Sequence, residues 1–217
     1  MSNLVIAIDG PAGAGKSTIA KIIAKDLNIN YIDTGAMYRA VTLKCLQHGV
    51  NIENEADVIE LAKKTYIDFK DNNIYLDNKI VNEEIRTIEV TNNVSNVAKI
   101  KEVRYLMVDV QREIGTRSSV ILDGRDIGSY VFPNADYKFF LIATPEERGH
   151  RRYKELIEKG VEVKLQDVID DIIKRDKIDS SREFAPLVKA SDAIEIDTTG
   201  KSIEDVVVSV LEKIKFK

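Results

Sequence analysis

The sequence predicts an α/β fold of three layers, in which a parallel β-sheet carries helices on both faces. Short apolar segments typical of buried strands alternate with longer segments of helical periodicity, which is the pattern of such a sheet. A glycine-rich loop at residues 10–17 fits the pattern G-x-x-x-x-G-K-[ST] and stands between an apolar segment and an amphipathic one. The loop therefore marks the first strand, the first helix and a phosphate site.

The expected elements follow one another along the 217 residues. The expected strands cover residues 4–8, a short segment near 31–32, and residues 120–123, 137–142 and 193–196. The expected helices cover residues 16–26, 36–47, 90–115, 145–159 and 202–213. Apolar residues such as Ile19 and Ile23 recur at helical spacing in the first helix. Thr144 and Pro145 form a typical helix start before two acidic residues.

One stretch interrupts this alternation. Residues 66–69, 74–76 and 79–81 are short β-like segments separated by Asp- and Asn-rich turns, which predicts a small antiparallel lobe inserted in the core. We expect a single domain over residues 1–217, made of three parts. The core takes about 1–56, 96–144 and 190–217, an insert takes about 57–95, and a helical lid takes about 145–189.

Composition excludes several classes of function. Hydrophobic residues make up 44% of the chain and charged residues 31%, which is typical of a globular protein. The net charge of −4 gives no field that would attract a nucleic-acid polymer or an anionic membrane. Cys45 lies among apolar residues and is interpreted as a buried hydrophobe, while His48 and His150 are isolated and form no metal cluster. The absence of a signal sequence or of a long apolar run favours the cytoplasm.

The glycine-rich loop predicts binding of ATP or a similar nucleoside triphosphate. Glycines let the backbone approach the phosphates, Lys16 can reach the β- and γ-phosphates, and the hydroxyl of Ser17 can bind Mg²⁺. The expected ATP-binding residues are Gly10, Pro11, Ala12, Gly13, Ala14, Gly15, Lys16, Ser17 and Thr18. Asp123 follows a strand facing this loop; it either holds a water of the Mg²⁺ shell or accepts hydrogen bonds from nearby backbone N–H groups.

Arginines indicate the second ligand. Arg39, Arg125, Arg175 and Arg182 are placed where they can converge on the carboxyl ends of the strands, and a guanidinium is suited to phosphate. The acceptor is therefore expected to be an anion. The basic segment 148–152 is ambiguous, since such a helical face is more often only solvated.

Five ordered motifs resemble bacterial cytidylate kinases almost from end to end. They are I-D-G-P-A-G-A-G-K-S at 8–17, D-T-G-A-M-Y-R at 33–39, D-G-R-D-I-G at 123–128, E-R-G-H-R-R at 147–152 and R-D-x-x-D-x-x-R-x-x-A-P-L at 175–187. The resemblance implies a P-loop kinase that uses Mg²⁺ and transfers a phosphoryl group from ATP to CMP or dCMP. It also implies that the insert at about 57–95 binds the nucleoside monophosphate.

The resemblance also implies roles for individual residues. Catalysis is assigned to Lys16, Arg125, Arg148, Arg152, Arg175 and Arg182. The acceptor phosphate is assigned to Arg39, Arg125 and Arg182, the base to Ser95, Arg104 and Asp126, the sugar to Arg175 and Asp179, and the pocket wall to Thr34 and Tyr38. A carboxylate that accepts from the N4 amino group suits cytosine better than uracil.

Two departures from the family pattern are small. Thr34 stands where the family often has serine, which keeps the hydroxyl. Gly149 stands in the expected lid helix where alanine is common, which costs about 1 kcal/mol of helix stability and favours a more mobile lid.

Other interpretations stay open. A kinase for another nucleoside monophosphate or for a shikimate-like metabolite would share the loop and the fold. A regulatory NTPase is disfavoured, because the only Asn-Lys pair, Asn78-Lys79, continues as Ile80-Val81 and lacks the N-K-x-D pattern. A monomer is expected, since two lobes that close around two substrates need no partner.

Overall fold

The computed structural model describes residues 3–70 and 72–214 and confirms the α/β class. Its main sheet has five parallel strands in the order β2-β6-β1-β7-β8. These strands are β1 (Val5–Asp9), β2 (Asn30–Asp33), β6 (Val120–Gly124), β7 (Tyr137–Ile142) and β8 (Ile194–Asp197). The α-helices are α1 (Lys16–Leu27), α2 (Thr34–Gln47), α3 (Glu55–Lys63), α4 (Ile88–Ala98), α5 (Lys101–Arg117), α6 (Pro145–Glu158), α7 (Leu165–Ser180) and α8 (Ile203–Leu211).

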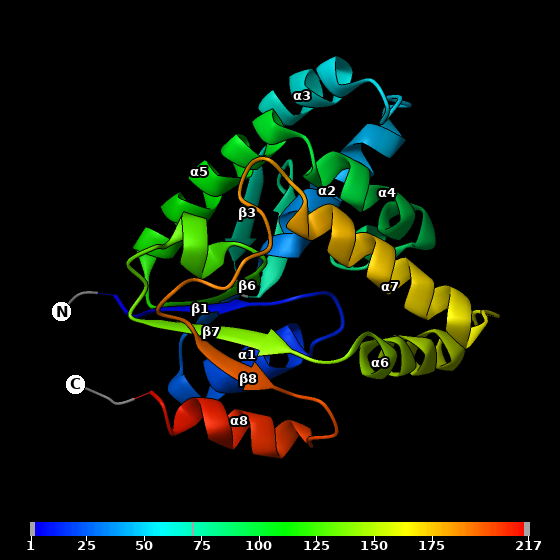
Figure 1. Ribbon diagram of the computed structural model, residues 1–217. Helices are drawn as coiled ribbons and strands as arrows, with labels where there is room; N and C mark the ends of the chain where they lie inside the picture. The colour runs from blue at the N-terminus through cyan, green and yellow to red at the C-terminus, as the bar shows by residue number, and fades with distance from the viewer. Residues whose placement is uncertain (1–2, 71, 215–217) are drawn as a thin grey trace.

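Helices cover both faces of the sheet, as the alternation along β1 requires. Ile6 and Ile8 pack with apolar residues of α1 and α8, whereas Ala7 packs with residues of α2, α4 and α5 on the other face. Figure 1 shows α1 and α8 below the sheet and α2 and α5 above it. All side chains of β6 are buried, which is typical of a central parallel strand.

The inserted antiparallel lobe is confirmed. Strands β3 (Ile67–Lys70), β4 (Asn73–Leu76) and β5 (Lys79–Ile80) form a three-stranded sheet in sequence order. Asp77 and Asn78 both have positive φ in the turn between β4 and β5, a conformation that short polar side chains tolerate. How the chain divides into core, insert and lid stays a prediction.

The prediction of one continuous helix over residues 90–115 was wrong. The structure breaks it into α4 and α5 at Lys99 and Ile100, where Ile100 is extended (φ −69°, ψ 118°) and 2% exposed. Val94, Val97, Ile100 and Val103 are all buried at a spacing that a continuous helix would also show. With no Gly or Pro at the break, the local pattern carries no signal for it.

Several elements were not predicted. Helix α3 and the one-turn helices Glu84–Arg86 (η1) and Ile127–Val131 (η2) lie outside the expected ranges, and α7 provides a second helix within the expected lid. Helix α6 packs on α7 near the carboxyl ends of the strands (Figure 1). Cys45 is fully buried, as expected, and His48 and His150 are exposed. No helix in the described part of the chain is long and apolar enough to cross a membrane.

Candidate active site

The glycine-rich loop joins β1 to α1 and has a conformation that only glycine tolerates at two positions. Gly10 has φ +144°, and a Cβ there would overlap the backbone carbonyl of Leu141. Gly15 caps α1 with φ +89°. The Lys16 ammonium donates a 2.7 Å hydrogen bond to the carbonyl of Pro11. The predicted ATP-binding residues thus form one loop at a helix N-terminus, the usual arrangement for phosphate binding.

Lys16 is buried among charges of both signs. Burial and the nearby charge of Arg125 lower its pKa well below the usual range, while Asp123 and Asp9 act in the opposite direction. The ammonium is therefore weakly solvated and close to the arginines of the acceptor side. A weakly solvated cation interacts strongly with phosphate oxygens.

Ser17 and Asp123 form the group that fits Mg²⁺. The Ser17 hydroxyl donates a 2.6 Å hydrogen bond to Asp123, and the Tyr31 hydroxyl donates to the other carboxylate oxygen at 3.0 Å. Burial raises the pKa of Asp123 above its ordinary value. Hydroxyl and carboxylate oxygens are the donors that Mg²⁺ prefers beside nucleotide phosphates. Asp123 thus accepts from side-chain hydroxyls rather than from the backbone, which supports the first of its two proposed roles.

Arginines predicted for the acceptor meet around Asp179. Arg125 donates from Nε to Asp179 at 2.8 Å, and Arg182 also pairs with this carboxylate. Burial opposes ionisation of Asp179, but Arg125, Arg182 and Arg175 hold its pKa below the ordinary value. Asp179 is only 1% exposed. One carboxylate therefore gathers arginines from the β6 loop and from the end of α7.

Positive charge accumulates in this region beyond what Asp179 can neutralise. Burial, followed by the charge of Arg125, lowers the pKa of Arg175 to about 10. Burial also lowers the pKa of Arg39 to about 10, with Arg86, Arg152 and Arg125 acting in the same direction. An anion bound among these groups would relieve their repulsion.

Residues predicted to read the base form a second group. Arg104 on α5 pairs with Asp126 at 2.7 Å and donates to the carbonyls of Ala98 and Ala185 at 3.2 and 3.3 Å. Its guanidinium carbon lies 5.4 Å from the centre of the Tyr38 ring. Burial raises the pKa of Asp126. Arg104 thus links helix α5 to two segments that the chain supplies much later.

The other predicted residues of the acceptor site lie outside the two charged groups around Asp179 and Arg104. Thr34 is buried at the start of α2 and donates a 2.7 Å hydrogen bond to the carbonyl of Asp123. Arg39 donates to Thr91 at 2.9 Å. Ser95 is partly buried on α4.

Unpaired polar atoms concentrate at the same place. In the described part of the chain, the buried side-chain atoms without a hydrogen-bond partner are Tyr38 OH, Arg104 Nε, Gln111 Oε1, Arg175 Nε, Asp176 Oδ1 and Arg182 Nε. Four of these six atoms belong to residues predicted to bind the acceptor. Buried polar groups are normally paired, so hydrogen-bonding capacity is available here for a polar ligand.

Basic residues of α6 do not share one environment. Arg148 is 3% exposed, donates to the carbonyl of Ala12 in the phosphate loop at 3.0 Å and pairs with Asp176 at 2.6 Å. Arg151 donates to the carbonyl of Thr198 at 2.7 Å. The solvated interpretation is therefore wrong for these two arginines. Arg152 forms a surface pair with Glu155 at 3.0 Å. Its influence on the acceptor residues is electrostatic, since its charge helps to lower the pKa of Arg39.

Sequence reasoning gave no role to Asp9 or Asp176, and it interpreted Gly149 only as a source of lid mobility. Asp9 and Asp176 stood inside quoted motifs, and a charged residue at the end of an apolar strand was the signal for Asp9. Gly149 is explained by packing, since a Cβ there would overlap the side chain of Ile169 on α7. The missing side chain at Gly149 allows α6 and α7 to approach closely.

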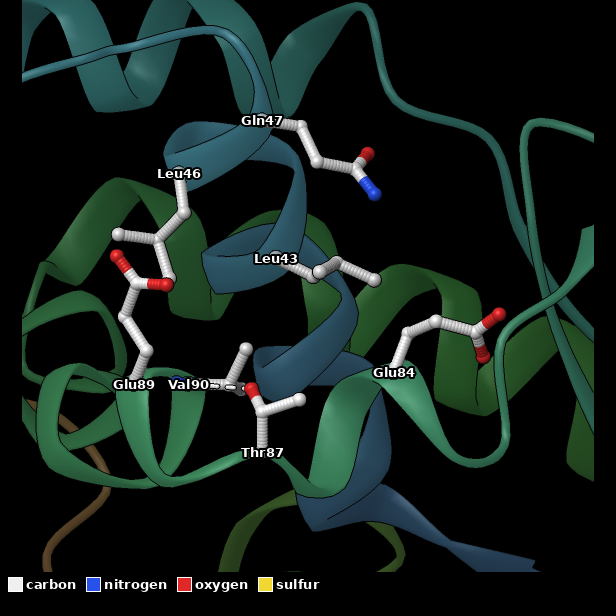
Figure 2. Close-up of a pocket in the computed structure, with 7 residues that line it drawn as sticks. All are labelled: Leu43, Leu46, Gln47, Glu84, Thr87, Glu89 and Val90. Atoms are coloured by element: carbon white, nitrogen blue, oxygen red, sulfur yellow. Dashed lines mark hydrogen bonds between the residues drawn. The ribbon is translucent and has the colours of Figure 1, made fainter.

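A pocket of about 310 Å³ lies apart from these residues, between α2, η1 and the start of α4 (Figure 2). Leu43, Leu46 and Val90 form its apolar part, with Glu84 and Glu89 at the edge. Thr87 caps α4 there by accepting a 3.3 Å hydrogen bond from Val90. None of the predicted site residues lines it.

The sheet, the glycine-rich loop and the facing arginines define a P-loop phosphotransferase. Two solved structures resemble this chain in fold, and their low sequence identity shows nothing beyond the fold. They are an uncharacterized protein from Eubacterium ventriosum ATCC 27560 (TM-score 0.56, 14% identity, 99% of this chain and 100% of that chain) and a gluconokinase from Sinorhizobium meliloti 1021 (TM-score 0.50, 12% identity, 96% and 90%).

The chain belongs to the cytidylate kinase family, whose model matches residues 6–216. It is 75% identical over 214 residues to a cytidylate kinase of Clostridioides difficile (strain 630), and 60% identical over 215 residues to one of Alkaliphilus oremlandii (strain OhILAs). Each alignment covers 99% of both chains. The resemblance seen in the motifs is thereby confirmed, and the protein is a nucleoside monophosphate kinase. The alternative acceptors and the regulatory NTPase are not favoured.

Proposed function

We propose that this enzyme transfers the γ-phosphoryl group of ATP to CMP and dCMP, giving the diphosphates. The observation that carries the proposal is the arginine cluster of Arg39, Arg125, Arg175 and Arg182, whose excess positive charge lies beside Lys16 of the phosphate loop. Donor and acceptor phosphates held by these two groups would be adjacent. Family membership and the close relatives support the choice of cytidine nucleotides.

Catalysis in this proposal rests on alignment and on neutralisation of charge. The loop N–H groups and Lys16 hold the donor phosphates, and Arg125 and Arg182 hold the acceptor phosphate. Arg148, fixed against the loop by its bond to Ala12, adds positive charge from the lid side. Phosphoryl transfer has a loose transition state in most analyses, so these contacts lower the barrier without a strong general base.

We assign the Mg²⁺ contact to Ser17, with Asp123 as the carboxylate that holds its water. A Mg²⁺ ion held there would supply positive charge that offsets the negative charge developing on the donor phosphates. The hydrogen bond from the exposed Ser17 to the buried Asp123 supports this assignment, since it places both oxygens at the end of the loop.

We assign recognition of the base to Arg104, Asp126 and Ser95, and contact with the sugar to Arg175 and Asp179. Arg104 offers donors for the O2 and N3 atoms of cytosine, and Asp126 accepts from the N4 amino group. We also propose that the enzyme acts as a monomer in the cytoplasm on small-molecule substrates alone.

A panel of nucleoside monophosphates tests the proposal. CMP, dCMP, UMP, AMP and GMP are each offered with Mg-ATP, and ADP release is measured. CMP and dCMP should give the highest kcat/KM. A higher value for another monophosphate, or for shikimate or gluconate included as controls, would contradict the proposed acceptor.

A further inference from the structure

We propose that Asp9 is a positioning residue, which fixes the acceptor-reading segment 125–128 against the phosphate loop and so sets both turnover and base selectivity. The inference rests on the proposed function, because it assumes that Arg125 and Asp126 contact the acceptor. Asp9 itself touches neither substrate in this proposal. It acts through the backbone of the residues that follow Asp126.

Asp9 connects the two halves of the site at the level of the backbone. It is the last residue of β1 and directly precedes Gly10 of the phosphate loop. Its Oδ1 accepts a 2.8 Å hydrogen bond from the N–H of Ile127, and its Oδ2 accepts a 2.7 Å bond from the N–H of Gly128. Both bonds join a charged acceptor to a backbone donor, a pairing stronger than its neutral counterpart.

Both ends of the short helix η2 are held by charged side chains. Asp9 accepts from its first two N–H groups, and Arg112 donates to the carbonyls of Val131 at 3.0 Å and Tyr130 at 3.0 Å at its far end. Each charge is opposite to the partial charge of the helix end it meets. Segment 127–131 therefore cannot slide along its axis, and Asp126 immediately before it is fixed.

The Asp9 carboxylate is buried and lies close to Gly128. A Cβ on Gly128 would lie 3.1 Å from Cδ of Lys138 and 3.4 Å from Oδ2 of Asp9. Asp9 is 4% exposed. Lys138 and Gly128 thus leave little free space beside the carboxylate, and its two hydrogen bonds are shielded from solvent.

Stability alone does not account for a carboxylate at this position. Burial raises the pKa of Asp9 to about 7, against the two hydrogen bonds that lower it. The neighbouring strand residues Ile6 and Ile8 are apolar and fully buried. A buried carboxylate is an unfavourable way to end such a strand, unless its two bonds hold something that function requires.

Asp9→Asn tests the proposal in the full-length enzyme. The amide keeps one acceptor oxygen but sets an N–H group against a backbone N–H, so one bond is lost and the segment must shift. We expect kcat/KM for CMP to fall at least about tenfold and the CMP-to-UMP ratio of kcat/KM to narrow at least about threefold. The KM for ATP should change less than the KM for CMP, because the loop backbone itself is retained.

Asp136→Asn is the matched control. Asp136 accepts a 2.9 Å hydrogen bond from the N–H of Val5, at the other end of the same strand. The chemical change is identical, but no predicted site residue is adjacent in the chain to Val5, whose N–H makes this bond. This variant should keep the wild-type selectivity ratio. Melting temperatures of both variants report the purely structural effect.

The proposal is overturned if Asp9→Asn folds and keeps the wild-type kcat, KM for CMP and selectivity ratio. Should Asp9→Asn fail to fold, Arg112→Met decides, since it removes both hydrogen bonds at the far end of η2 while keeping an unbranched apolar stem. An unchanged ratio in that variant also overturns the proposal. Failure of the proposed function is distinguishable, because the wild-type enzyme itself would then not prefer CMP.

Discussion

Arg104 and Asp126 form an ion pair of 2.7 Å in which the side chains are only 2% and 7% exposed. Arg125, the residue next to Asp126 in the chain, pairs with Asp179 and not with Asp126. Asp126 is therefore free of the phosphate-binding arginine and joined to the residue assigned to the base. A donor and an acceptor fixed side by side match the polar edge of cytosine.

Asp126→Asn should narrow the CMP-to-UMP ratio of kcat/KM by at least about tenfold, equivalent to roughly 1.4 kcal/mol. The carboxylate repels the O4 atom of uracil, whereas an amide can turn either its donor or its acceptor toward the base. Steady-state kinetics with both nucleotides measure the ratio. Asp68→Asn, which breaks a surface pair with Arg117, is the control for loss of an ion pair. Equal losses towards CMP and UMP would refute a base-reading role.

Lys16→Ala should lower kcat by orders of magnitude and leave the fold intact. The lost ammonium neutralises charge on the transferred phosphoryl group, and its removal also takes a poorly solvated cation out of a cluster of arginines. Circular dichroism and thermal melting check the fold, and ADP release checks turnover. A variant that retains near wild-type turnover would remove Lys16 from the mechanism.

The region from about Arg148 to Arg182 should exchange amide hydrogens faster without ligands than with both nucleotides bound. Asp179 of this region already pairs with Arg125, and bound phosphates would add contacts to the arginines of the region itself. Hydrogen exchange with and without a bisubstrate analogue measures the difference. Equal protection in the two states would count against a moving lid.

Gly149→Ala should destabilise the protein, although alanine is the better helix former by about 1 kcal/mol. The new methyl group overlaps Ile169, and overpacking of this kind costs about 1–3 kcal/mol, so the clash outweighs the helix propensity. Thermal melting measures the loss. Ile169→Ala removes the obstructing atoms and should make the double variant less unstable than the two single losses predict. Strict additivity would contradict direct contact.

The pH dependence of stability should differ between the wild type and Asp9→Asn. Burial raises the pKa of Asp9 from 3.8 to about 7, with Asp126 adding to the rise and Lys16 opposing it. A raised folded-state pKa gives a stabilising contribution that is complete below about pH 4 and lost as pH rises through about 7.

The unfolding free energy of the wild type should therefore fall relative to that of Asp9→Asn over this interval, by at most about 4 kcal/mol at 1.36 kcal/mol per pKa unit. Urea unfolding at several pH values, without nucleotides, measures the difference. Parallel curves for the two proteins would mean that Asp9 does not titrate in this range.

Local sequence was sufficient for the elements whose signal is local. The glycine-rich loop, the antiparallel turns at Asp77 and Asn78, and the capping of α6 by Thr144 were all predicted, because glycine, short polar residues and helix caps fix backbone geometry within a few residues. The break at Ile100 was missed, because the buried positions on either side fit a continuous helix and no local residue marks the break.

By itself the sequence determined the α/β class, the phosphate loop and the set of arginines from which the site is assembled. Only the tertiary structure decided the pairing among them: Arg104 with Asp126, Arg125 and Arg182 with Asp179, and Arg148 with Asp176. The two hydrogen bonds to Asp9 also came from the structure alone. The physical reason is distance along the chain. Arg104 and Asp126 lie 22 residues apart and Asp9 and Gly128 119 apart, so helix packing and strand order, not local propensity, bring them together.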